Sequence, residues 1–287
     1  MSKIVSVGEL LVDKIGEPDS TLKDSSSFSK RAGGAPANVA VAASRLGADV
    51  EMIATVGKDE FGDFLVERLE DEGVKVKNIW RSEKKTTLAF VALDEENKPH
   101  FSFYRGADEH IHKGQLDLDL DSDDILHIGS LPFTRSETAR DIIGALEEKE
   151  ARVSFDPNLR GELLTEDYKT SLKEVIDHVD ILTAAEDELE FFGGLDRLRE
   201  KIDEILVTRG EKGADLYVGD GKHHFDAEEV DVVDTTGAGD ALTGSYLASR
   251  SRGMDERSSL EKAVRAASIS TTKKGAMEAL PHREELE

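Results

Sequence analysis

Short apolar runs alternate with segments of helical periodicity along most of the chain. The runs predict buried strands at 3–7, 50–56, 125–128, 153–156, 181–182, 205–208 and 214–218. Apolar positions at helical spacing predict helices at 37–46, 61–72, 136–150, 187–192, 239–251 and 258–271. Strands that alternate with helices are typical of βαβ units, so we expect an α/β fold with a mostly parallel sheet.

Two segments interrupt this alternation. Residues 10–31 are polar and rich in serine, whereas residues 86–105 predict a hairpin with strands 88–93 and 100–104 and a polar turn between them. We expect both segments to form one small antiparallel sheet. The large α/β domain would then comprise residues 1–9, 32–82 and 106–287, with residues 10–31 and 83–105 forming the small sheet.

The segment Asp234-Thr-Thr-Gly-Ala-Gly-Asp240 joins a predicted strand at 230–233 to the predicted helix at 239–251. Its glycines leave backbone N–H groups free at a helix N-terminus, where they can bind a phosphate or a developing oxyanion. The negative charge of Asp240 would repel such an anion. Its position there is explained if Asp240 accepts a proton from a hydroxyl that attacks phosphorus. The alternative is a glycine-rich turn that only caps the helix, with Asp240 complementing the helix dipole.

The familiar phosphate-binding loops do not match this segment. The chain contains no G-x-x-x-x-G-K-[ST] motif, and Leu242 stands where the dinucleotide fingerprint has its third small residue.

A longer set of motifs resembles the ribokinase-like carbohydrate kinases of the phosphofructokinase-B type. The motifs are Asp234-Thr-Thr-Gly-Ala-Gly-Asp-Ala241, the glycine- and alanine-rich segment 33–47, and shorter segments at 57–62, 155–160 and 207–214. The resemblance extends over residues 4–281 and implies a three-layer α/β/α domain with a small β lid over a sugar. It also implies ATP-dependent phosphorylation of a sugar hydroxyl. The exposed face of such a lid can pair between subunits, so a homodimer through the lid is one expectation.

The resemblance implies roles for particular residues. Asp240 would be the general base, and the backbone N–H groups of its three predecessors would stabilise the transferring phosphoryl group. Asp13 and Asn38 would bind the sugar beside two glycines that allow close approach, and Arg105 at the end of the lid hairpin would join them. Taken singly, these side chains could instead be a turn residue, a helix cap and a surface cation. The glycines and the alanine in these two sets are Gly237, Ala238 and Gly239 at the phosphoryl group and Gly33 and Gly34 at the sugar.

On the nucleotide side, the resemblance places Thr208 and Gly210 near the phosphates and ribose, and the region 266–276 against the adenine. Lys212, Lys274 and their neighbours belong to the same candidate site, although either lysine could be an ordinary surface residue. The cofactor-binding candidates are Thr208, Gly210, Lys212, Gly213, Gly237, Gly239, Ala267 and Lys274.

The resemblance also implies metal ions. Relatives often bind a monovalent cation, for which Asp234 and Thr236 are the candidate ligands here and K⁺ the candidate ion. An Asn-x-x-Glu motif usually organises water bound to Mg²⁺. In this chain Glu188 retains the glutamate, whereas Ala185 occupies the asparagine position.

The charge balance restricts the partners. The formal net charge of −24 argues against nucleic-acid binding. ATP is itself an anion, so its site needs local positive potential from helix termini, a metal ion and a few lysines. The acidic surface favours solubility or adaptation to a saline cytoplasm.

The absence of cysteine excludes disulfides and thiolate catalysis. No apolar run reaches the roughly 18 residues of a membrane span, and no signal-peptide pattern precedes residue 4. We therefore expect a cytoplasmic protein with no membrane partner.

Within the family, segments 7–13, 155–160 and 271–276 look most like those of fructokinases, which implies conversion of D-fructose to fructose 6-phosphate. One alternative is 2-keto-3-deoxygluconate kinase, because Tyr104-Arg105 resembles its aromatic-arginine element. That acidic sugar would need a cationic clamp, for which Arg105, Arg31 and Arg160 are candidates. Ribokinase and a non-catalytic sugar-binding regulator are further alternatives, but a regulator has no need of a base at Asp240.

Overall fold

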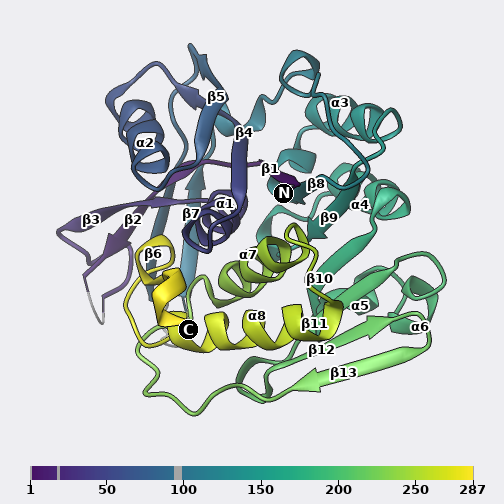
Figure 1. The fold of residues 1–287 in the computed structure, drawn as a ribbon. Coiled ribbons are helices and arrows are strands. Elements are labelled where there is room, and N and C mark those ends of the chain that lie inside the picture. Colours follow the sequence, from purple (N-terminus) through teal and green to yellow (C-terminus); the bar gives the residue numbers. More distant parts are fainter. Residues whose placement is uncertain (1, 18–19, 94–98, 287) are drawn as a thin grey trace.

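The computed structural model describes residues 2–17, 20–93 and 99–286, which form two β-sheets and their surrounding helices (Figure 1). The main sheet has nine strands in the order β13-β12-β11-β10-β9-β8-β1-β4-β5. Its pairs are parallel except β11–β12 and β12–β13, which are antiparallel. Its strands are β1 (Lys3–Val7), β4 (Asp49–Gly57), β5 (Lys75–Ser82), β8 (Ile125–Gly129), β9 (Arg152–Asp156), β10 (Ile181–Ala185), β11 (Glu204–Thr208), β12 (Ala214–Val218) and β13 (Gly221–Phe225).

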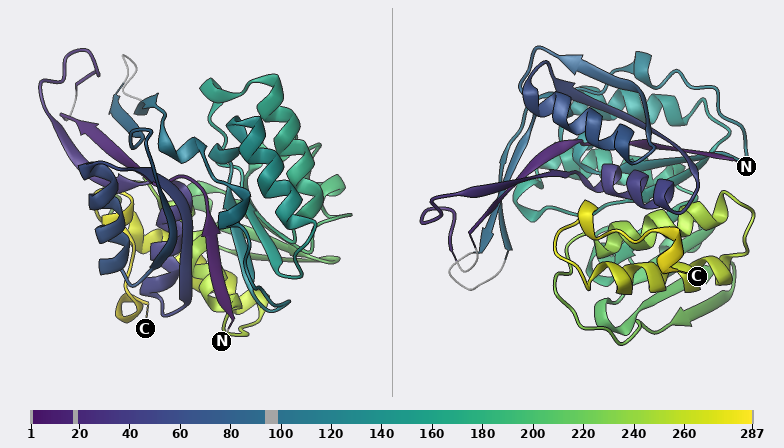
Figure 2. Two further views of the ribbon diagram at one scale, coloured as in Figure 1. Left: turned by 90° about the horizontal axis from the view of Figure 1, so that it is seen from above. Right: turned by 60° about the vertical axis from the view of Figure 1, so that its left-hand side comes forward.

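Helices cover both faces of this sheet (Figures 1 and 2). Successive side chains of a strand point to opposite faces, so Ile4 of β1 packs in one core while Val5 and Val7 pack in the other. The first core contains α1 (Ala35–Arg45), α2 (Glu60–Asp71), α7 (Ala238–Arg250) and α8 (Glu256–Ser270). The second contains α3 (Ser136–Leu146), α4 (Glu166–Val175), α5 (Glu186–Phe191) and α6 (Leu195–Leu198). The expected three-layer α/β/α architecture is thus confirmed.

A second sheet forms the lid and projects from one side of the main body (Figure 2). Its four strands have the order β3-β2-β6-β7. The pairs β2–β3 and β6–β7 are antiparallel, as expected, but β2 and β6 are parallel. The lid is therefore a mixed sheet, because β2 and β6 follow the parallel strands β1 and β5 and leave the main sheet in one direction. Its strands are β2 (Leu11–Gly16), β3 (Phe28–Gly33), β6 (Leu88–Leu93) and β7 (Pro99–Tyr104); the predicted turn at 94–98 lies outside the described residues.

Two of the predicted elements differ from the structure. The segment 230–233 is a loop, in which Val232 and Val233 are each 62% exposed. The backbone N–H groups of Val233 and Asp234 donate to the carbonyl of Thr271, so the segment is bound to the end of α8, and no described strand pairs with it. The helix predicted at 136–150 ends at Leu146. Among the described residues, no helix is both long and apolar enough to span a membrane.

Candidate active site

A cavity of about 760 Å³ lies at the carboxyl ends of β1, β8, β9, β10 and β11, with lid residues on its wall. Ligands of open α/β sheets bind at these strand ends, where the strand order reverses, and the volume is within the usual range for ligand pockets. Of the predicted site residues, this cavity is lined by Asp13, Gly34, Asn38, Glu188, Thr208, Thr236, Gly237, Gly239 and Asp240.

Two glycines allow two acidic residues to approach the cavity. A Cβ on Gly33 would lie 2.0 Å from Oδ2 of Asp13, and a Cβ on Gly34 would lie 2.3 Å from the backbone oxygen of Glu9. Gly34 also has a φ of 110°, which L side chains rarely adopt. The predicted glycines thus make room for Glu9 and Asp13, and burial raises the pKa of Asp13 to about 7, although the Arg160 guanidinium opposes this rise.

Asp240 lies in the first turn of α7 and is 7% exposed. The Asn38 side-chain amide donates a 2.8 Å hydrogen bond to its Oδ2, which joins α1 to α7 across the cavity. Burial raises the pKa of Asp240 to about 7, and this rise is limited by the hydrogen bond from Asn38 and by the charge of Arg160. A carboxyl with this pKa is suited to general base catalysis near neutral pH.

The backbone before Asp240 presents N–H groups to the cavity. Gly237 has a left-handed φ of 80° and is the N-cap residue of α7. A Cβ there would lie 2.9 Å from the Cα of Ala276, so glycine is required. The N–H of Ala238 donates to the carbonyl of Thr235 at 3.2 Å, whereas those of Gly237 and Gly239 have no acceptor among the described residues. Two of the three predicted N–H donors are therefore free to bind an anion.

Acidic side chains predominate on the cavity wall. Among the described residues that line it, Arg160 is the single Lys or Arg side chain, and its guanidinium lies over the ring of Phe101 from the lid, 5.0 Å from the ring centroid. Burial and the charges of Glu188 and Asp240 raise the pKa of Asp156 well above its usual value. The six acidic residues on the wall are Glu9, Asp13, Asp156, Asp187, Glu188 and Asp240.

Glu9 and Asp156 were not predicted from the sequence, and Arg160 was predicted only as a helper of the cationic clamp. The missed signal was position, because Glu9 lies two residues after β1 and Asp156 ends β9, both strands of the parallel part of the sheet.

Glu188 connects the loop after β9 to the junction of β10 and α5 on the cavity wall. Its Oε1 accepts the N–H of Leu159 at 2.6 Å, and its Oε2 accepts the N–H of Ala185 at 2.8 Å. Ala185, which replaces the expected asparagine, is the N-cap residue of α5 and has no side-chain acceptor. In the described part of the chain, no group of three or more His, Asp and Glu residues is arranged to hold a metal ion.

Asp234 stabilises the loop that leads to α7. Its Oδ1 accepts hydrogen bonds from the backbone N–H and the hydroxyl of Thr236, and its Oδ2 accepts the N–H of Gly275. These hydrogen bonds outweigh partial burial and lower the pKa of Asp234. Thr236 lines the cavity, but Asp234 does not.

Several predicted residues are not on the cavity wall. Arg105 forms a 2.7 Å ion pair with the buried Asp108 and a 3.3 Å hydrogen bond with Thr134. Gly213 has a φ of 78°, and a Cβ there would lie 1.9 Å from the backbone oxygen of Phe225, so it is required by the β12–β13 hairpin. The predicted residues absent from the wall are Gly33, Arg105, Gly210, Lys212, Gly213, Asp234, Ala238, Ala267 and Lys274.

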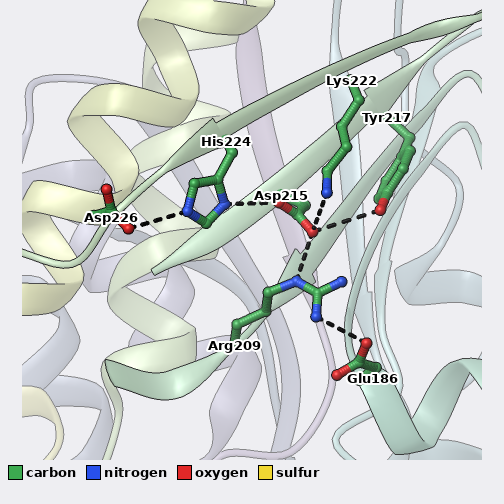
Figure 3. A network of polar contacts seen from close by, with 7 residues as sticks. All are labelled: Glu186, Arg209, Asp215, Tyr217, Lys222, His224 and Asp226. Carbon is green, nitrogen blue, oxygen red and sulfur yellow. Dashed lines mark hydrogen bonds and ion pairs between the residues drawn. The ribbon is translucent and has the colours of Figure 1, made fainter. Parts of the chain in front are cut away.

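A polar network surrounds Asp215 on β12, the strand that pairs with the end of β11 at Thr208 (Figure 3). Asp215 is 1% exposed and accepts a 2.5 Å hydrogen bond from Nε of Arg209. Nη1 of Arg209 bonds Glu186 of α5 at 2.8 Å. Burial disfavours the charge of Asp215, but hydrogen bonds from Lys222, Arg209 and a histidine outweigh it and lower its pKa. Arg209 thus joins the loop after Thr208 to the helix that carries Glu188.

Comparison with known proteins agrees with this geometry. The profile of the pfkB family carbohydrate kinases matches residues 1–283. A probable fructokinase-4 from Arabidopsis thaliana is 35% identical over 315 residues, covering 100% of this chain and 96% of the relative. The structure of a fructokinase with bound ATP from Xylella fastidiosa is similar with a TM-score of 0.89 and 29% identity, covering 99% of this chain and 96% of that one.

The structure of a fructokinase from Vibrio cholerae O395 in a form with bound fructose, ADP and calcium ion is also similar. It has a TM-score of 0.87 and 29% identity, and the match covers 100% of this chain and 98% of that one. Since the family profile and these relatives match almost the whole sequence, the chain belongs to the pfkB family of carbohydrate kinases.

Proposed function

We propose that this carbohydrate kinase transfers the γ-phosphoryl group of ATP to the terminal hydroxyl of D-fructose and forms fructose 6-phosphate. The observation that carries the proposal is Asp240, a buried carboxyl at the N-terminus of α7, beside the free N–H groups of Gly237 and Gly239. A proton acceptor and an anion site stand together there, as phosphoryl transfer to a hydroxyl requires.

Asp240 removes the proton from the attacking hydroxyl. The hydrogen bond from Asn38 fixes one carboxylate oxygen and leaves the other available to the sugar. A pKa of about 7 allows the carboxylate to exist at neutral pH and still accept a proton readily. Asp13, on the lid strand β2, is placed to accept hydrogen bonds from other hydroxyls of the same sugar.

The phosphate end fits a nucleotide with a divalent ion. The free N–H groups at Gly237 and Gly239 can bind phosphate oxygens, and Glu188 can bind water of a Mg²⁺ ion held mainly by the phosphates. Bound Mg²⁺–ATP supplies the phosphoryl group, and the ion offsets charge on its β and γ oxygens. Arg160 contributes the positive side chain on the wall. A K⁺ ion near Asp234 and Thr236 remains a separate proposal, tested by comparing activity in potassium and choline salts.

The charge of the cavity favours a neutral sugar. Six acidic residues and one arginine line it in the part of the chain that the structure describes, so the carboxylate of 2-keto-3-deoxygluconate would meet repulsion unless Arg160 bound it. Arg105 forms an ion pair with Asp108 and is not on the cavity wall, so it is less available as the clamp that the acidic sugar needs. A neutral ketose can donate its hydroxyls to the same carboxylates without this repulsion.

The test is a coupled assay of ADP release with fructose, 2-keto-3-deoxygluconate and ribose at saturating ATP and Mg²⁺. We expect the highest kcat/KM for fructose. A tenfold preference for the acidic sugar, about 1.4 kcal/mol of transition-state free energy, would refute the fructose assignment and leave the kinase assignment intact. Absence of turnover with every sugar, although the sugar binds, would instead favour a non-catalytic regulator.

A further inference from the structure

Glu9 follows β1 at the point where the strand order of the main sheet reverses. From β1 the sheet continues through β4 and β5 on one side and through β8 to β13 on the other. This reversal is where ligands of open α/β sheets bind. The Glu9 side chain lines the cavity, although the residue is only 4% exposed.

The two carboxylate oxygens of Glu9 differ in their environment. Oε1 accepts the N–H of Ala35 at 3.0 Å, at the start of α1. Oε2 is buried and has no hydrogen-bond partner in the part of the chain that the structure describes. The neighbouring strand end offers it no side chain, because Gly129 lies there, and a Cβ on this glycine would be 3.4 Å from Oε2.

Burying a carboxylate oxygen without a hydrogen-bond partner costs free energy, so we expect Oε2 to accept a hydrogen bond when the protein has bound its ligand. Arg105 lowers the pKa of Glu9 by its charge, but it forms its close ion pair with Asp108. Burial dominates and raises the pKa of Glu9 to about 7. Within the described residues no group of the protein bonds Oε2, although the buried Nε and Nη2 of Arg105 also have no hydrogen-bond partner. A donor for Oε2 therefore comes either from a ligand in the cavity or from a movement of Arg105 out of its ion pair with Asp108.

We propose that Oε2 of Glu9 accepts a hydrogen bond from a sugar hydroxyl other than the one that is phosphorylated, and so makes Glu9 a specificity-determining residue. This inference rests on the proposed sugar kinase function. A substrate that carries a hydrogen atom, an ether or a carboxylate in place of that hydroxyl would leave Oε2 unpaired or repelled. Such mismatches against a buried polar group discriminate strongly between substrates.

The test combines Glu9→Gln with fructose and a panel of its monodeoxy analogues. The amide oxygen of the glutamine can still accept the N–H of Ala35, while an NH₂ group replaces Oε2. We expect the KM for fructose to rise tenfold or more and the KM for ATP to stay within twofold. With the wild type, one deoxy analogue should have a kcat/KM at least tenfold lower than that of fructose. With Glu9→Gln, the same analogue should differ from fructose by less than twofold, since the variant already lacks Oε2, the partner of the missing hydroxyl.

Glu51→Gln is a matched control. Glu51 is also 4% exposed, accepts a 2.6 Å hydrogen bond from Asn78 and lies outside the cavity wall. Its variant should retain both KM values. Glu9→Asp, which keeps the charge but withdraws the oxygens, provides a second variant if Glu9→Gln does not fold, and we expect the same selective rise in the KM for fructose.

Unchanged KM for fructose in a folded Glu9 variant would overturn the inference, as would equal sensitivity of wild type and variant to every deoxy analogue. Failure of the wild type to phosphorylate any sugar would be a different result, because it would reject the proposed function itself.

Discussion

Replacing Asp240 with asparagine should make the protein more stable at and above neutral pH while it removes most of the activity. Burial raises the pKa of Asp240 from its ordinary value of 3.8 to about 7. Between these two pH values the folded protein holds a proton on Asp240 that the unfolded chain has lost. Folding is therefore favoured at low pH, and the free energy of unfolding of the wild type falls as the pH rises through this window.

The size of the effect follows from the same two values. The difference between 3.8 and about 7 corresponds to about 4 kcal/mol at pH 8, at about 1.4 kcal/mol for each pH unit. Asparagine does not titrate, so the free energy of unfolding of Asp240→Asn should not fall in this way. Its excess over the wild type should be near zero at pH 4 and approach about 4 kcal/mol at pH 8. Loss of the Asp240 charge also relieves repulsion on Asp13, which acts in the same direction.

Urea unfolding of both proteins from pH 4 to pH 9 measures the difference. Asp220→Asn, at an exposed aspartate, is the control and should give a curve parallel to that of the wild type. Turnover by Asp240→Asn should fall by about a hundredfold or more, the usual range for loss of a general base. Parallel stability curves for Asp240→Asn and wild type would refute the reasoning, because Asp240 would then not hold its proton into the neutral range.

Three further predictions concern the substrate sites. Asp13→Ala should raise the KM for fructose far more than the KM for ATP, since losing a charged hydrogen-bond partner costs about 1.5–3 kcal/mol; steady-state kinetics with each substrate varied would show an equal rise in both if the assignment is wrong. Arg160→Ala should lower kcat/KM for fructose at least tenfold, because it removes the cation of the cavity wall, and full activity would exclude this role. Arg209→Ala should raise the KM for ATP, because Arg209 joins the loop after Thr208 to α5. Lys222 contacts Asp215 but not α5, so Lys222→Ala should leave this KM unchanged. Equal effects of the two variants would show that only the stability of the network matters.

Local sequence predicted those helices and strands whose own residues carry a clear apolar pattern. β12 was predicted at its observed limits because it is apolar and lies between two glycines, Gly213 and Gly219. β13 was missed because Lys222, His223 and His224 give an edge strand little apolar character. The reverse error occurred at 230–233, where valines indicated a strand. Strand formation requires a neighbouring strand, and that information is not local.

In the candidate site, too, some features follow from local motifs and others depend on tertiary packing. Asn38 and Asp240 are 202 residues apart but were both predicted from motifs, and the structure joins them by a hydrogen bond. The roles of the two arginines were less predictable because long side chains can reach several partners. Arg105 binds Asp108 three residues later, whereas Arg160 reaches the cavity and contacts the lid at Phe101. This choice depends on tertiary packing and not on either local motif.

The charge of the cavity connects these observations. The sequence suggested that lysines would offset the acidic chain at the phosphates, but Lys212 and Lys274 are not on the cavity wall. Burial acts instead, because it raises the pKa values of Glu9, Asp13 and Asp240 to about 7, so these groups carry only part of their formal negative charge at neutral pH. In the proposed function, this partial neutralisation would reduce the repulsion that a bound phosphate meets, in addition to the charge that Mg²⁺ offsets. The same desolvation would make Asp240 a stronger proton acceptor than an exposed carboxylate, so one physical cause would serve both anion binding and catalysis in the proposed reaction.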